Sequence, residues 1–290
     1  MQILNFGSLN IDHVYAVEHF ARAGETLDTS DYRVFAGGKG FNQSIALARA
    51  GARVAHAGQI GEDGRWLVDE LADAGVDVRF VAVSETPTGH AVIQVLRGGE
   101  NSILIHGGAN RTIDEAQMRA AIEAAAPGCL LLIQNEINGL DRIMEMASQK
   151  GLQIVLNPSP VTSSLLALPL EKVSTFVLNE VEAGLLSSGS GPEQILDGLR
   201  RRFPDAAVVL TRGESGVEYA DPSQRESVSA ERVEAIDTTG AGDTFAGYFL
   251  AERLNGVAVE DALRLACRAA AVCVQRPGAA ASIPRREEIA

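Results

Sequence analysis

Apolar runs of strand length alternate with amphipathic segments along most of the 290-residue chain. The strand-like runs lie at residues 2–7, 54–61, 129–136, 152–158, 175–180 and 206–213. The helix-like segments lie at residues 42–52, 63–75, 141–151 and 192–203. The strand-like runs are continuously apolar, as in parallel strands that helices cover on both faces. The pattern therefore predicts a single α/β domain over residues 1–290, built on a mainly parallel central sheet.

Two segments depart from this alternation. Residues 10–35 carry no convincing helix, and residues 88–106 resemble two strands joined by a turn at "RGGEN", residues 97–101. Together these segments predict a small β flap standing on the main domain. The stretch "SSGSG" at residues 187–191 is typical of a loop between helices.

Composition and charge narrow the classes of partner. The chain is 46% hydrophobic and 22% charged, as expected of a soluble globular protein. Its N-terminal stretch shows no basic region followed by a long apolar run, and no apolar run is long enough to span a membrane, so we expect a soluble, cytoplasmic protein without a membrane partner. The net charge of -13, with no basic run, disfavours nucleic acid as a partner. Clustered backbone N–H groups can still bind small anions.

The cysteine and histidine patterns give little support for a transition-metal site. The three cysteines form no CxxC pair, and the five histidines form no HExxH motif. We expect Cys129, Cys267 and Cys273 to be buried free thiols.

The stretch "DTTGAGDTFAG" places Gly240, Ala241 and Gly242 at the start of a helix predicted to run from Ala241 to about Leu254. Free N–H groups and the helix dipole favour an anion at such a start. Asp243 in the first turn has two interpretations. It could simply complement the dipole, or it could be a reactive carboxylate beside a bound anion.

The second glycine-rich stretch, "FAGGKGFNQ", precedes a helix predicted to begin near Phe41 or Asn42. It is not a Walker A loop, because Gly40 rather than a hydroxyl residue follows Lys39. Nor does it follow the first strand, as a dinucleotide fingerprint would. Alone it is equally compatible with a tight turn.

Together, "GGKGFNQ" and "DTTGAGDTFAG" resemble the two signatures of the ribokinase-like (PfkB) carbohydrate kinase family, most closely its ribokinase branch. The resemblance extends over nearly the whole chain. It implies a three-layer α/β/α domain with a β lid from about 11–35 and 88–106, which would also be the interface of a homodimer. It implies an ATP-dependent kinase that phosphorylates the primary hydroxyl of a pentose, most simply D-ribose to D-ribose 5-phosphate, with Mg²⁺ and an activating K⁺.

The resemblance also implies roles for individual residues. The sugar-binding residues would be Asn10, Asp12, Gly38, Lys39, Asn42, Glu136 and Asp243, with Ala91 and Ile103 as apolar contacts. The nucleotide-binding residues would be Asn179, Thr211, Gly213, Gly216, Gly242 and Cys267, the last where the family can place a histidine near adenine. Glu182, with Asn179, would organise Mg²⁺ and the phosphates. Simpler interpretations remain open: Asn10 and Asp12 could cap a turn, Asn179 could cap a helix from Glu180, and residues 211–216 could merely connect strands.

For catalysis, the resemblance implies that Asp243 is the general base and that Gly240, Ala241 and Gly242 build the anion hole, with the backbone N–H groups of Ala241, Gly242 and Asp243 facing the γ-phosphoryl oxygens. It assigns a monovalent-cation site to Asp237 and Thr239 together with the loop 273–282. That loop would contribute the carbonyls of Cys273, Arg276 and Gly278 and the hydroxyl of Ser282.

One departure from the family pattern bears on the substrate. Phe41 stands where a small residue is common, and we expect its ring at the edge of the sugar pocket, although it could instead pack beneath the helix. Two alternative functions remain. The protein could phosphorylate another sugar or a nucleoside, although its few aromatic residues argue against a base-stacking site. It could also be a non-catalytic sugar or nucleotide sensor, against which the intact GAGD stretch argues.

Overall fold

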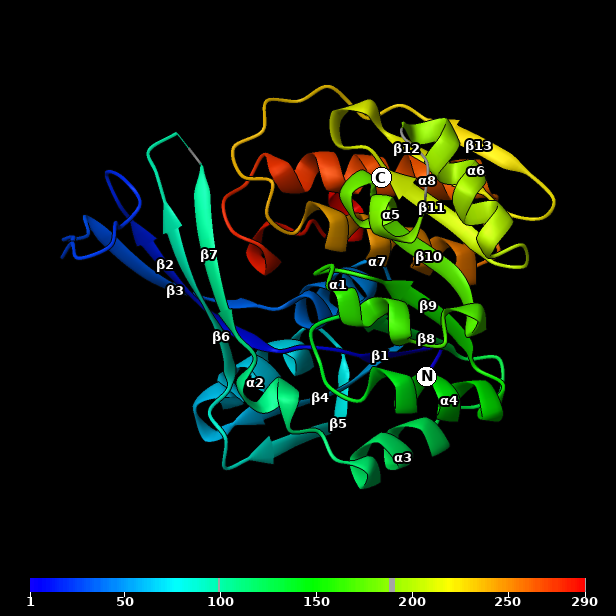
Figure 1. Cartoon of the computed structure of the whole chain (residues 1–290), viewed down its shortest axis with the longest axis horizontal. Helices are drawn as coiled ribbons and strands as arrows, with labels where there is room; N and C mark the ends of the chain where they lie inside the picture. Colours follow the sequence, from blue (N-terminus) through cyan, green and yellow to red (C-terminus); the bar gives the residue numbers. More distant parts are fainter. Residues whose placement is uncertain (99, 188–190, 290) are drawn as a thin grey trace.

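Residues 1–98, 100–187 and 191–289 are described by a computed structural model, which contains one large sheet and one small sheet (Figure 1). The predicted turn at 97–101 and loop at 187–191 each include residues outside these ranges. In spatial order, the large sheet consists of β13 (Arg225–Val228), β12 (Val217–Ala220), β11 (Ala207–Thr211), β10 (Val173–Asn179), β9 (Gln153–Asn157), β8 (Leu130–Gln134), β1 (Ile3–Phe6), β4 (Val54–Gly61) and β5 (Asp77–Ser84).

The large sheet is mainly parallel, as the sequence predicts. Every neighbouring pair from β11 to β5 runs parallel, and only β12 and β13 pair antiparallel at one edge. Successive residues of the central strands enter opposite apolar layers: Leu131 and Ile133 pack in one, Leu130 and Leu132 in the other. The continuously apolar sequences arise because both faces of these strands are buried.

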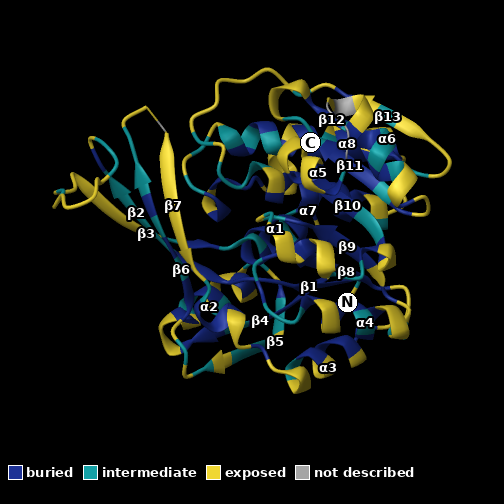
Figure 2. Ribbon diagram, in the orientation of Figure 1, coloured by how far each residue is buried: buried dark blue, intermediate teal, exposed yellow. Residues whose placement is uncertain are grey.

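Helices cover both faces of this sheet and form the predicted three layers (Figures 1 and 2). One layer consists of α1 (Lys39–Arg49), α2 (Arg65–Asp73), α7 (Ala241–Leu254) and α8 (Val259–Val274). The other consists of α3 (Glu115–Glu123), α4 (Leu140–Lys150), α5 (Glu180–Leu186) and α6 (Pro192–Arg202). None of the helices described here is long and apolar enough to cross a membrane.

The two glycine-rich helices begin at glycines with positive φ. α7 begins at Ala241, as predicted, after Gly240 with φ 79°. α1 begins at Lys39, two or three residues earlier than predicted, because Gly38 with φ 90° already ends the preceding extended segment. Glycine adopts this conformation without the steric penalty that other residues incur.

The small sheet has the order β3 (Asp31–Gly37), β2 (Asn10–Ala16), β6 (Gly89–Val95) and β7 (Asn101–His106). It projects from the large sheet, and β7 is exposed along its length (Figures 1 and 2). Its outer pairs are antiparallel, whereas β2 and β6 run parallel. The predicted second sheet is therefore present, with one parallel pair at its centre.

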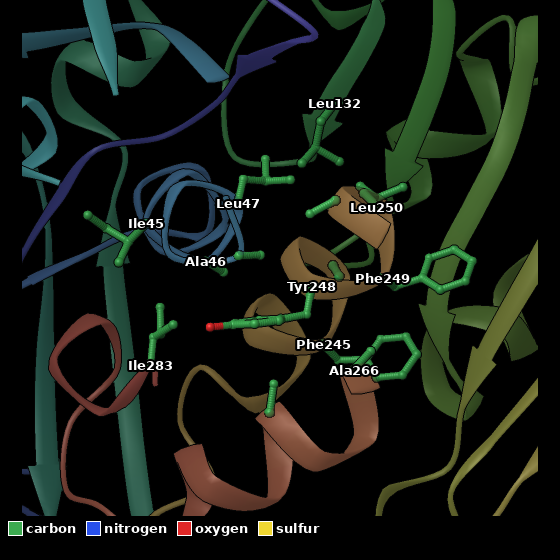
Figure 3. Close-up of a cluster of buried hydrophobic side chains, with 14 of the residues drawn as sticks. Ile45, Ala46, Leu47, Leu132, Phe245, Tyr248, Phe249, Leu250, Ala266 and Ile283 are labelled. Atoms are coloured by element: carbon green, nitrogen blue, oxygen red, sulfur yellow. The ribbon is translucent and has the colours of Figure 1, made fainter. Parts of the chain in front are cut away.

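Helices α1 and α7 pack closely together (Figure 3). Tyr248 extends from α7 toward α1 and the C-terminal segment, and its hydroxyl donates to the Pro284 carbonyl at 2.7 Å. The contact between α1 and α7 holds the two glycine-rich helix starts together.

All three cysteines are buried free thiols, as expected.

Candidate active site

Polar side chains gather where the central parallel strands end. Gln134 at the end of β8 pairs in register with Asn157 at the end of β9, and Asn179 on β10 pairs with Thr211 on β11. Ligands of open α/β sheets bind at these carboxyl ends. A cavity of about 200 Å³, here called the strand-end pocket, opens at this edge. It is lined by Lys39, Asn157, Val177, Leu178, Asn179, Glu182, Thr211, Thr238, Gly240, Gly242 and Asp243.

The start of α7 forms one wall of the strand-end pocket. A Cβ atom added to Gly242 would meet open space, so the backbone there is accessible to a ligand. The N–H of Ala241 donates to the Thr238 carbonyl at 3.3 Å, whereas the first-turn N–H groups of Gly242 and Asp243 have no carbonyl one turn earlier in the helix. This helix start is suited to an anion.

Asp243 lies between the strand-end pocket and the residues predicted to bind the sugar. Its side chain is 6% exposed. Oδ2 accepts a hydrogen bond from Asn42 at 3.1 Å, and Oδ1 accepts one from Gln43 at 2.8 Å. The Lys39 ammonium lies 4.0 Å from Oδ1. The carboxylate is therefore held at the helix start by two amides and faces a cation.

Lys39 connects the strand-end pocket to the residues predicted to bind the sugar. Its backbone N–H donates to Glu136 Oε2 at 3.0 Å, and Ser8 Oγ donates to the same oxygen. Burial lowers the pKa of the Lys39 ammonium, but the charges of Asp243, Glu136 and Glu182 outweigh burial, so the net pKa is raised. Lys39 is thus positively charged beside the place where an anion would bind.

Asp12 is a carboxylic acid that holds its proton to a much higher pH than usual. Burial, together with the negative charge of Glu136, raises the pKa of Asp12 to about 7. A Cβ atom on Gly37 would lie 2.0 Å from the Asp12 carboxylate, so only glycine fits opposite it. Two carboxyl groups held close together mark a place where a polar ligand can bind.

The remaining predicted sugar contacts lie around this pair. Asn10 is buried and accepts from Asn110 Nδ2 at 2.8 Å, and a Cβ on Gly38 would lie 3.0 Å from the Asn10 nitrogen. Ala91 pairs in register with Asp12 and is buried. Ile103, farther along β7, is 46% exposed. The structure therefore brings Asn10, Gly38 and Ala91 together with Asp12 and leaves Ile103 at the sheet surface.

Asn179 and Glu182 form the capping box of α5. Asn179 Oδ1 accepts from the Glu182 N–H at 2.9 Å, and Glu182 Oε2 accepts from the Asn179 N–H at 3.0 Å. The simpler interpretation of Asn179 as a helix cap is correct. Both residues also line the strand-end pocket, and both oxygens of the Glu182 carboxylate accept hydrogen bonds from Asn179.

The predicted nucleotide loop is a turn between antiparallel strands. Thr211 ends β11 and lines the strand-end pocket. Gly213 and Gly216 flank the connection from β11 to β12, where the Arg212 N–H donates to the Gly216 carbonyl at 2.8 Å. Of the described residues that line the strand-end pocket, none is Gly213, Gly216 or Cys267. Cys267 is buried among apolar side chains, and burial followed by the Glu231 charge raises its pKa to about 11.

Asp237 joins the segment before α7 to the C-terminal loop. Its Oδ1 accepts from the Thr239 N–H at 2.9 Å, and its Oδ2 accepts from the Gly278 N–H at 2.9 Å. Ser282 Oγ is buried, donates to the Ala279 carbonyl at 2.7 Å and lies 3.0 Å from Cys273 Sγ. Asp237 therefore contacts Thr239 and Gly278, and Ser282 lies beside Cys273, whose Sγ is 3.9 Å from the Thr239 carbonyl.

The Arg276 side chain points to Glu288, with 2.6 Å between the charged atoms, so any contribution to the cation site comes from its backbone.

The expectation that Phe41 lies at the edge of the sugar pocket is wrong. Phe41 is fully buried in the apolar cluster of α1 and α7 and lines a second cavity of about 550 Å³, outside the described lining of the strand-end pocket.

Sequence reasoning missed a set of buried amides behind Asp243. Gln43, Gln134 and Asn5 are fully buried and hydrogen-bonded to one another or to Asp243. The available signal was one amide residue at or near the end of an apolar strand, as in "ILNF" and "LLLIQ". A buried amide in such a strand requires a partner.

Comparison with known proteins agrees with this geometry. Residues 2–286 match the family described as "pfkB family carbohydrate kinase". The ribokinase of Haemophilus influenzae is 36% identical over 294 residues, which cover 97% of this chain and 95% of that protein. The ribokinase of Staphylococcus aureus is 36% identical over 303 residues, which cover 99% and 98%.

Solved structures are similar over the same length. A Cryptococcus neoformans ribokinase in complex with ADP matches with a TM-score of 0.86 and 33% identity, covering 99% of this chain and 98% of that one. An Arabidopsis thaliana ribokinase complexed with ribose and ATP matches with a TM-score of 0.86 and 28% identity, covering 99% and 96%. The chain therefore belongs to the pfkB family of carbohydrate kinases.

Proposed function

We propose that this protein transfers the γ-phosphoryl group of ATP to the primary hydroxyl of D-ribose, forming D-ribose 5-phosphate. The observation that carries the proposal is the position of Asp243. It lies at the start of α7, between the strand-end pocket and the cluster of Asp12, Asn42 and Glu136. The similarity to ribokinases over nearly the full length supports ribose as the acceptor.

In this mechanism the chain positions the reactants and stabilises charge. The sugar hydroxyls form hydrogen bonds with Asp12, Asn42 and Glu136. Asp243 accepts the proton of the attacking hydroxyl as that oxygen bonds to the γ-phosphorus, while the bond from this phosphorus to the β,γ-bridging oxygen breaks and ADP leaves. The N–H groups of Gly242 and Asp243, with the Lys39 ammonium, stabilise the negative charge of the transferred group.

Two cations belong to the proposal. Glu182, with Asn179, would organise Mg²⁺ and the nucleotide phosphates, since both residues line the strand-end pocket. Asp237, Thr239 and Ser282, with the carbonyls of Cys273, Arg276 and Gly278, would hold K⁺. When bound, such cations supply positive charge that offsets phosphate repulsion beside the anion hole. Adenine would bind near Thr211 and the β11–β12 turn.

The small sheet has a role in the same proposal. It would act as the lid of a single-domain enzyme, closing over the sugar with Ala91 on its inner face. Its exposed apolar residues, Ile103, Leu104 and Ile105, would form the interface of a homodimer. We place the enzyme in the cytoplasm, where its cosubstrate ATP is available.

A coupled ADP-release screen tests the proposal. The enzyme would be assayed with ATP, Mg²⁺ and K⁺ against ribose, 2-deoxyribose, other pentoses, hexoses and nucleosides. The proposal expects the highest kcat/KM with ribose. Preference for 2-deoxyribose would instead follow the deoxyribokinases, which are 31% identical to this chain. Absence of sugar-dependent ADP with every acceptor would favour the sensor alternative.

A further inference from the structure

A chain of buried amide side chains ends on the Asp243 carboxylate. Gln43, one residue after Asn42 on α1, is fully buried. Its Nε2 donates to Asp243 Oδ1 at 2.8 Å and to Asn157 Oδ1 at 3.1 Å. Both protons of this amide are therefore used.

The orientation of the Gln43 amide is set by residues farther from Asp243. Gln43 Oε1 accepts from Gln134 Nε2 at 2.7 Å, and the same Nε2 donates to Asn5 Oδ1 at 2.9 Å. Asn5 Nδ2 donates to the Gly40 carbonyl at 2.7 Å and to Ser44 Oγ at 2.8 Å. Each amide can satisfy these partners in only one orientation, because a flip at Gln43 would turn its oxygen toward the Asp243 carboxylate.

We propose that Gln43 is a positioning residue for Asp243 and that Gln134 acts through Gln43 by setting the orientation of its amide. The inference rests on the proposed function, in which Asp243 accepts the proton of the sugar hydroxyl. The carboxylate plane is fixed because Gln43 holds one oxygen and Asn42 holds the other. Lys39 Nζ stands 4.0 Å from the oxygen that Gln43 holds.

Loss of the Gln43 donor has a defined consequence. The Oδ1 atom would lose its hydrogen bond from the Gln43 amide and turn toward the Lys39 ammonium, forming a closer ion pair. A carboxylate drawn to Lys39 is misaligned with the hydroxyl. Displacement of a reacting group by about 1 Å can lower the rate roughly 10²-fold.

The kinetic test uses Gln43→Met, which keeps an unbranched side chain of similar length but removes the amide. We expect kcat to fall about 10- to 100-fold, with less than about threefold change in KM for sugar and ATP, because the binding contacts remain. Gln134→Met should lower kcat less, and the double variant should be no slower than Gln43→Met, since Gln134 acts through Gln43.

A matched control separates positioning from loss of stability. Leu71 is a fully buried apolar residue on α2, outside the amide chain and the contact between α1 and α7. Leu71→Ala should lower the melting temperature while leaving kcat unchanged. The proposal is overturned if the fold reductions in kcat of the two single amide variants multiply in the double variant, or if Gln43→Met keeps wild-type kcat. Gln43→Asn, whose amide is too short to reach both partners, replaces Gln43→Met if the latter does not fold.

A crystal structure of the Gln43→Met variant gives an answer that does not depend on turnover. We expect the Asp243 carboxylate to rotate toward Lys39, and an unchanged carboxylate would overturn the proposal. If wild-type protein forms no ADP with any acceptor, the proposed function fails, and this structural comparison still decides whether Gln43 positions Asp243.

Discussion

Gly247 on α7 lies directly against Ala46 on α1. A Cβ atom built on Gly247 would come within 2.4 Å of the Ala46 Cβ and 2.9 Å of the backbone around it. The two helices approach closely because Gly247 has no side chain at this point. This contact aligns the helix starts that carry Lys39 and Asp243, so the glycine acts on the active site through packing.

Gly247→Ala is therefore expected to destabilise the protein even though alanine is the better helix former. Overpacking should lower the free energy of unfolding by about 1–3 kcal/mol, measured by urea denaturation. Gly184→Ala on α5 is the matched control, since a Cβ there meets open space. The control should be neutral or stabilising by up to about 1 kcal/mol. Equal effects of the two substitutions would contradict the packing explanation.

Phe41→Ala tests the corrected position of that ring. Because Phe41 is fully buried in the apolar cluster, its truncation should lower the free energy of unfolding by about 3–5 kcal/mol. The order of sugars by kcat/KM should not change. Phe249→Ala, in the same cluster, should behave alike. A changed sugar order at near-wild-type stability would return Phe41 to the edge of the pocket.

Asp12 predicts a pH dependence of stability. Its folded-state pKa of about 7 lies above the ordinary value of 3.8, so the folded protein binds more protons than the unfolded chain between these pH values. The free energy of unfolding contributed by this group therefore falls as pH rises from about 4 to 7 and is constant above that.

Asp12→Asn removes this contribution. The variant should be more stable than wild type at pH 8, and its gain at pH 5 should be much smaller. We expect the two gains in the free energy of unfolding to differ by roughly 2 kcal/mol, since the group is partly exposed. Thermal and urea unfolding at both pH values measure the effect. Asp69→Asn, exposed on α2, provides the control. An equal gain in stability at pH 5 and pH 8 would show that folding does not raise the pKa of Asp12.

The proposed cation site predicts activation by K⁺. Activity should be higher in KCl than in matched tetramethylammonium chloride, because bound positive charge would stabilise the adjacent anion hole. Asp237→Asn should abolish the difference between the two salts. Equal rates of the wild-type enzyme in both salts would rule out a functional cation at these residues.

The sequence predicts those parts of the fold that local patterns determine. The central strands are continuously apolar, and α7 begins where Gly240 permits a positive φ. The sequence does not predict the edge strands β5 and β13 or the neighbouring β12, because β5 and β13 are partly exposed and β12 has only four residues. Their positions depend on pairing with neighbours rather than on their own pattern.

The candidate site was predictable only in part. The glycine-rich helix starts and Asp243 stand out locally, whereas Gln43, Gln134 and Asn5 lie far apart in the chain and meet only when β1 and β8 pair beneath α1. The position of Phe41 also escaped prediction, because adjacent residues of a helix point in different directions. Phe41 is buried beside Asn42, which faces Asp243.

The turnover of Asp243→Asn tests the central claim most directly. With sugar and ATP binding measured separately by calorimetry, we expect binding to be retained and kcat to fall about 10²- to 10⁴-fold, because asparagine cannot accept the hydroxyl proton. Near-wild-type kcat in this variant would contradict the assignment of Asp243 as the general base.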